Sequence, residues 1–201
     1  DGPFLSHCLE DGFLPAVAGD PFRFALMWAN HDWIDIHPRK RSTPPALLYP
    51  GAVNPEQFRQ ITDLIIERYF KHPNYYLRDG KPYFSIYHLQ ELIRGLGGFQ
   101  ATRDALSDFR ERAVKSGLPG LHLNAIVWGS PVLPGEEEDR PRGEVVQALG
   151  FDSTASYVWI HHFPLPKQAE YPYPEAMESY FRAWDELEKS SSLPYYPNVT
   201  M

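Results

Sequence analysis

The stretch FRFALMWANHDWIDIHP, residues 22 to 38, begins as an apolar run and ends as a cluster of functional side chains. The ten positions from Trp28 onward hold two tryptophans, an asparagine, two histidines and two aspartates. Residues 22–28 predict a buried β-strand, because short apolar runs bounded by polar residues are typical of strands covered on both faces. The polar cluster therefore follows directly after a predicted strand end.

Strand and helix signals alternate along the rest of the chain. Asn54-Pro55-Glu56 predicts a helix start, with Asn as the N-cap and Pro at the first helical position, and apolar spacing extends this helix to about Phe70. Further apolar runs predict strands at 82–87, 121–128 and 153–159. Helical periodicity predicts helices at 99–116, at about 143–149 and from 174 onward, the last with Met177, Phe181, Trp184 and Leu187 facing inward.

These elements predict an α/β fold. Strands that are apolar almost throughout indicate a parallel sheet with helical crossovers, as in a (β/α) barrel or an open doubly wound sheet. No G-x-G-x-x-G or P-loop motif follows a predicted strand, which weakens the nucleotide-binding version of the open sheet and points to no cofactor. We therefore expect the (β/α)8 TIM-barrel type, with residues 1–201 as a single (β/α) domain.

The composition argues against two classes of partner. Hydrophobic residues make up 43% of the 201 residues, yet no run of about 18 apolar residues occurs, so we expect no membrane span. The net charge is -7 and the one basic cluster is Arg39-Lys40-Arg41, which argues against nucleic acid binding. Cys8 is the single cysteine, so an internal disulfide is excluded.

All four predicted strand ends finish in aromatic or histidine residues, and functional groups of a (β/α) barrel gather at strand ends. Aromatic rings stack on the C–H faces of sugars, so the pattern predicts an aromatic cleft for a neutral, hydroxyl-rich ligand. The candidate substrate contacts are Trp28, Asn30, Tyr87, His88, Trp128 and Tyr157.

His31 and Asp32 are the candidate catalytic residues in this chain. A neutral histidine can hold a sugar hydroxyl or transfer a proton near pH 7, and Asp32 is a carboxylate next to a strand end. The alternative for Asp32 is capping or an ion pair with Arg39. A metal site is not favoured, because the histidines and aspartates follow neither H-x-H nor H-E-x-x-H spacing and no cysteine pair exists.

Four segments resemble one known family. They are similar to segments of the glycoside hydrolase family 99-like group. The four segments are residues 24–33 with the W-A-N-H motif, the helix after Asn54, the Y-x-x-x-D-G-K-P phrase within residues 75–87, and the G-F-D step at 150–152. That group includes the WbsX-like glycosyltransferases. The resemblance covers nearly the whole chain, and it implies a (β/α)8 barrel that acts on polysaccharide or glycan chains.

The resemblance also implies that part of the barrel lies outside this chain. A complete barrel needs about 250 residues, whereas four or five strands are predicted here. In the family a W-N-E-W-x-E-G motif supplies a pair of glutamates, and this chain contains no such motif. We therefore expect the chain to be the central portion of the barrel, with the catalytic carboxylates beyond Met201. His31 stands where much of the family has glutamate, so a carboxylate role cannot be transferred to it.

Several functions stay open from sequence alone. A glycoside hydrolase is the first expectation, and a glycosyltransferase of polysaccharide biosynthesis or a non-catalytic glycan-binding barrel are the alternatives. A compact α/β domain of another kind is a further possibility. In a partial barrel the exposed strand edges need the rest of the barrel or a partner chain to cover them. Localisation is open, with export more usual for glycan-degrading relatives.

Overall fold

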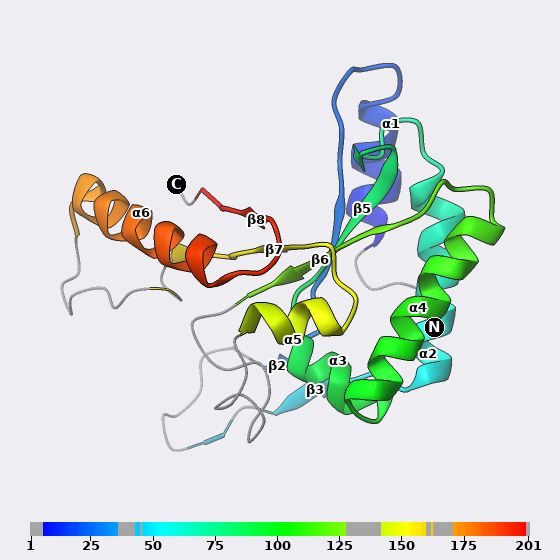
Figure 1. Ribbon diagram of the computed structural model, residues 1–201. Coiled ribbons are helices and arrows are strands. Elements are labelled where there is room, and N and C mark those ends of the chain that lie inside the picture. Colours follow the sequence, from blue (N-terminus) through cyan, green and yellow to red (C-terminus); the bar gives the residue numbers. More distant parts are fainter. Residues whose placement is uncertain are drawn as a thin grey trace.

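The computed structural model describes residues 6–35, 43–44, 46–127, 142–159, 162 and 171–199. Its centre is a parallel sheet, which confirms the α/β class (Figure 1). In order across the sheet the parallel strands are β1 (Leu26–Trp28), β5 (Lys81–Ile86), β6 (His122–Ile126), β7 (Ser153–Ala155) and β8 (Tyr195–Tyr196). The short strand β4 (Leu77–Arg78) pairs antiparallel with β5, and β2 (Trp33–Ile34) and β3 (Leu47–Tyr49) form a separate antiparallel hairpin.

Helices fill the connections between the parallel strands. Figure 1 shows α2 and α4 side by side beyond one face of the sheet, whereas α6 extends away from them next to β7 and β8. None of the helices in the described part of the chain is long and apolar enough to cross a membrane. The helical elements are η1 (Cys8–Phe13), α1 (Leu14–Ala16), α2 (Pro55–Ile65), η2 (Ile66–Phe70), α3 (Leu89–Leu96), α4 (Phe99–Lys115), α5 (Arg142–Ala148) and α6 (Tyr173–Ser190), where η marks π-helical turns.

The predicted start of α2 is confirmed in detail. The backbone N–H of Gln57 donates to Asn54 Oδ1 at 2.9 Å, and the backbone N–H of Asn54 donates to Gln57 Oε1 at 3.0 Å. This reciprocal capping box satisfies two amide groups that a helix N-terminus otherwise leaves unpaired, while Pro55 occupies a position where no N–H is needed. The helix then continues through η2 to Phe70, as the apolar spacing predicts.

The apolar core lies between the sheet and the helices, with Phe109 of α4 at its centre. The Phe109 ring has no exposed surface and contacts the rings of Phe58, Phe70 and Phe84, at centroid distances of 5.9 to 6.1 Å. These partners come from α2, η2 and β5, so a single side chain of α4 joins the neighbouring α2–η2 helix to the middle of the sheet. The core therefore fixes which face of β5 points toward the helices.

The opposite face of the sheet is polar and buried. Ser85 Oγ donates to Asn124 Oδ1 at 3.1 Å, and Asn124 Nδ2 donates to Ser153 Oγ at 2.9 Å. Ser153 Oγ also lies 2.8 Å from Nε2 of His122, whose ring stacks on Tyr83. Buried polar groups are tolerated only when they are hydrogen-bonded, and these side chains from β5, β6 and β7 satisfy one another.

Three predicted strands are shorter in the structure than in the sequence analysis, and the one predicted at 121–128 is observed over His122–Ile126. Residues before Leu26 are held by Asn74, whose Nδ2 donates to the carbonyl oxygens of Asp20 and Phe22 at 2.8 Å, instead of by a long neighbouring strand. The strand that starts at Ser153 ends at Ala155, because Ser156 Oγ then bonds the hydroxyl groups of Tyr180 and Tyr195. The β2–β3 hairpin and α3 were not predicted.

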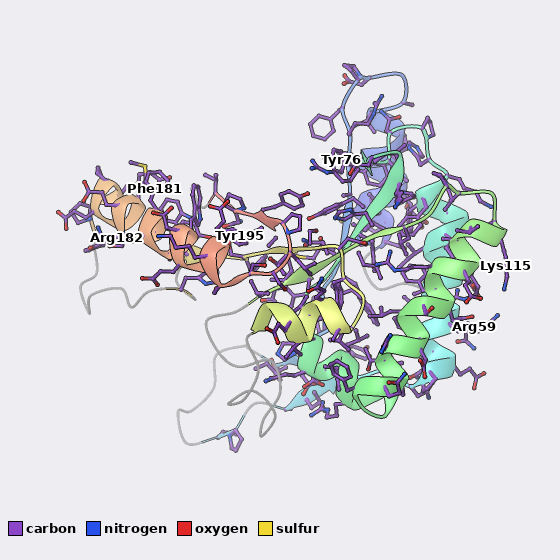
Figure 2. The ribbon with its side chains drawn as sticks, viewed as in Figure 1. Arg59, Tyr76, Lys115, Phe181, Arg182 and Tyr195 are labelled. Carbon is purple, nitrogen blue, oxygen red and sulfur yellow. The ribbon has the colours of Figure 1, made fainter. Side chains whose placement is uncertain are left out.

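The inward face of α6 was predicted partly wrongly. Ala176, Tyr180 and Ala183 are the buried residues, whereas Phe181 is 42% exposed. Phe181 and Arg182 project outward from α6 (Figure 2). The helix turns this way because Tyr180 packs its ring 4.7 Å from that of Trp159, a residue that the helix sequence alone does not reveal.

The substitution Phe109→Ala should lower the free energy of unfolding by about 3–5 kcal/mol, because it leaves a cavity among three aromatic rings. Urea denaturation followed by circular dichroism measures this change. Val114→Ala is the matched control on the same helix, since Val114 is 54% exposed, and it should shift the value by less than about 0.5 kcal/mol. Equal effects of the two substitutions would contradict the assigned core.

Candidate functional site

A row of rings lies at the carboxyl ends of the parallel strands. The ring of His31, after β1, stacks on Trp33 with a centroid distance of 5.7 Å and an interplanar angle of 13°. The same histidine ring lies 5.5 Å from Tyr87, after β5, and Tyr87 meets Tyr157, after β7, edge to face at 4.9 Å. We call Trp33, His31, Tyr87 and Tyr157 the aromatic row. Three predicted site residues are thus brought together.

Asn30 holds two of these strand ends together. Its Nδ2 donates to the carbonyl oxygen of His88, and its Oδ1 accepts from the backbone N–H of His88, both at 2.8 Å. The side chain is 2% exposed. Both polar atoms of the Asn30 amide therefore bond the backbone of His88. This geometry suits Asn30 to a positioning role and not to contact with a ligand.

Asp32 is also engaged by the protein. Its Oδ1 accepts from the backbone N–H of Gly51 at 2.7 Å and lies 3.9 Å from the guanidinium of Arg94. A Cβ atom on Gly51 would come within 2.4 Å of the carbonyl carbon of His31, so only glycine fits there. Asp32 therefore joins the segment after β3 to the backbone that carries His31. The Arg39 partner considered for Asp32 lies outside the described residues.

His88 caps α3 with its ring. The Nδ1 atom accepts from the backbone N–H of Glu91 at 3.3 Å, so the neutral ring carries its proton on Nε2. Burial lowers the pKa of His88 and nearby His31 lowers it further, while the carboxylates of Glu91 and Asp32 act in the opposite direction. The imidazole therefore stays neutral to lower pH than an exposed histidine.

Tyr87 is likewise held in its neutral form. Burial raises the pKa of its hydroxyl, with a smaller contribution from neighbouring Tyr157. Arg94, whose charge acts on His88, is engaged in ion pairs with Glu91 and Asp32. The aromatic row thus offers ring faces and uncharged hydrogen-bonding groups, a combination that suits a neutral polyhydroxylated ligand.

The remaining predicted site residues lie elsewhere. Trp28 pairs with Ile86 in the sheet and packs its ring 6.0 Å from Phe58, on the side covered by helices. Trp128 lies outside the described residues. Among the residues that the structure describes, no three His, Cys, Asp or Glu side chains converge as a metal site would require.

Sequence reasoning missed Trp33 and Gly51 as site residues. Trp33 stands within the polar cluster that opens the sequence analysis, so its ring type and position were available as a signal. Gly51 follows Pro50, and this pattern indicates a turn. It does not predict that the backbone N–H of Gly51 bonds Asp32. The contact with His31 depends on the hairpin, which local patterns do not reveal.

Replacing Asn30 should destabilise the protein, because the backbone N–H and carbonyl oxygen of His88 would lose their hydrogen-bond partner. We expect Asn30→Ala to lower the free energy of unfolding by about 2 kcal/mol. Gln100→Ala is the control, since Gln100 is exposed and its amide bonds only a neighbouring Asp104 in the same helix, at 2.8 Å. Chemical denaturation measures both values, and an unchanged stability in Asn30→Ala would contradict the positioning role.

Stability should fall as the pH drops through the ordinary histidine range of about 6.5. Burial lowers the pKa of His88 and of His122, so the unfolded chain binds protons that the native chain does not, and this favours unfolding in acid. His88→Asn keeps a capping side chain and removes the titration. The difference in unfolding free energy between about pH 8 and pH 5 should shrink in this variant, and an undiminished difference would contradict the effect of burial on His88.

Comparison with known proteins identifies the family. The profile described as glycosyltransferase WbsX matches residues 13–187, which is most of the chain. No curated protein matches it. Among solved structures, the GH99 endo-alpha-mannosidase from Bacteroides thetaiotaomicron is similar at 16% sequence identity and a TM-score of 0.38, over 72% of this chain and 36% of that chain. This chain therefore spans little more than a third of that protein's length. It belongs to the glycosyltransferase WbsX family, a family of carbohydrate-active enzymes.

Proposed function

We propose that this chain supplies the glycan-binding strand ends of a carbohydrate-active enzyme, most simply a glycoside hydrolase that acts on polysaccharide or glycan chains. The proposal rests on the aromatic row, in which rings from three strand ends lie within 5.7 Å of their neighbours. Stacking against these rings would hold the C–H faces of pyranose units, and His31 and Tyr87 would bond their hydroxyl groups.

Within this proposal the two candidate catalytic residues have different tasks. His31 lies between Trp33 and Tyr87, where its ring can contact a bound sugar and exchange a proton with a hydroxyl group. Asp32 supports His31 through its bond to Gly51, so it acts as a positioning residue. The carboxylate pair that glycoside hydrolysis ordinarily requires would then come from outside this chain.

We also propose that residues 1–201 form one (β/α) domain, the central portion of a (β/α)8 barrel. The strand order supports this idea, because β1, β5, β6, β7 and β8 follow one another across the sheet without reversal. An open doubly wound sheet would reverse direction at a switch point. The buried polar face of β5, β6 and β7 would then face the barrel interior, and further strands or a partner chain would cover the outer edges of β1 and β8, the outermost strands among the described residues.

A glycosyltransferase is the second candidate, favoured by the description of the matching family. Both reactions break the anomeric C–O bond of the transferred sugar. A hydrolase passes that sugar from a glycan to water, whereas a transferase passes it from an activated donor to a sugar hydroxyl. The aromatic row serves either reaction. Release of reducing ends from a polysaccharide by the full-length protein in water alone would favour the hydrolase, and a requirement for an activated sugar donor would favour the transferase.

The binding proposal is tested on an array of neutral polysaccharides, followed by titration calorimetry with the glycans that bind. Tyr87→Ala should weaken binding about tenfold, which corresponds to about 1.4 kcal/mol for a lost ring contact. Tyr76→Ala is the control, because Tyr76 is 40% exposed and adjoins β4 instead of the strand ends (Figure 2). Absence of glycan binding by the unmodified full-length protein, or equal loss in both variants, would refute the proposed site.

A further inference from the structure

The β2–β3 hairpin presents an aromatic pair beside the aromatic row. Trp33 and Tyr49 are directly opposite one another in the register of the hairpin, and their exposed fractions are 39% and 61%. Rings on directly opposite strand positions lie close enough to act together. Trp33 is also the outermost member of the aromatic row, since it stacks on His31. The hairpin therefore continues the row beyond the strand ends.

The hairpin is fixed to the candidate site by backbone contacts. The backbone N–H of Asp35 donates to the carbonyl oxygen of Ala46 at 2.8 Å, which holds the two strands together. The N–H of Gly51, two residues after β3, donates to Asp32, and the Gly51 backbone touches that of His31. Tyr49 is thus held at a defined position relative to His31.

We propose that Trp33 and Tyr49 form a distal subsite that stacks on a sugar unit further along a glycan chain than the units held by His31, Tyr87 and Tyr157. This inference rests on the proposed glycan-binding function and specifies its substrate as an extended chain of neutral hexoses. The stack of Trp33 on His31 places the hairpin pair next in line after the strand-end rings. A disaccharide would occupy the strand-end rings and leave the hairpin empty.

A second copy of the chain is the competing occupant, because Leu47 and Leu48 on the same hairpin are 56% and 54% exposed. The sugar is favoured by continuity, since Trp33 belongs both to the hairpin pair and to the stack with His31. A protein partner would need apolar area of any shape, whereas a sugar needs ring faces. This difference can be tested by substitution.

The experiment compares a disaccharide with a hexasaccharide, in gluco-, manno- and galacto-configured series, by titration calorimetry. Tyr49→Leu keeps apolar area but removes the ring, and it should weaken hexasaccharide binding about tenfold while leaving disaccharide binding unchanged. Tyr49→Phe should retain the affinity for both lengths. Leu48→Ala, on the same hairpin, is the matched control and should change neither.

Each outcome separates the two proposals. If the unmodified full-length protein binds neither sugar length, the proposed function fails and the subsite fails with it. If it binds both lengths but the Tyr49→Leu variant binds the hexasaccharide as tightly as the unmodified protein does, only the subsite is refuted. Equal weakening for both lengths also refutes a distal position. Sedimentation showing a dimer that Leu48→Ala dissociates would instead assign the hairpin to self-association. Unchanged circular dichroism confirms that each variant is folded.

Discussion

The candidate site depends on the pair of hydrogen bonds between the Asn30 amide and the backbone of His88. These bonds join two segments that are 58 residues apart in sequence, at the end of β1 and the start of α3. The neighbours of the two residues, His31 and Tyr87, are brought into ring contact as a result. An amide buried in this way cannot be replaced by water, so the tie holds the site in one arrangement.

The sheet divides the molecule into an apolar side and a polar side. Phe84 and Leu123 point into the helix-covered core, whereas Ser85, Asn124 and Ser153 bond one another on the opposite face. A polar face open to water would not need this internal network, because water would satisfy its groups. The network is therefore consistent with an enclosed interior, as the proposed barrel would provide. Tyr87 and Tyr157 lie just beyond it, at the carboxyl ends of β5 and β7.

Charge neutrality defines the chemistry that the site can support. Burial lowers the pKa of His88 and raises that of Tyr87, so both rings are uncharged around neutral pH. The nearby cation, Arg94, is engaged by Glu91 and Asp32. Ring faces and neutral donors favour sugars over phosphates or metal ions, since those ligands require charged partners.

Local signals were sufficient for much of the fold. The apolar run at β5, the cap at Asn54 and the periodicity of α4 determined their elements because each depends on residues close together in sequence. Sequence also placed His31, Tyr87 and Tyr157 at strand ends, and parallel strands bring their ends to one edge. Only the tertiary structure decided that Asn30 binds His88, that Trp28 packs with the core and that the β2–β3 hairpin extends the row. Those features depend on contacts between distant segments, and no local pattern specifies which distant partner a side chain will meet.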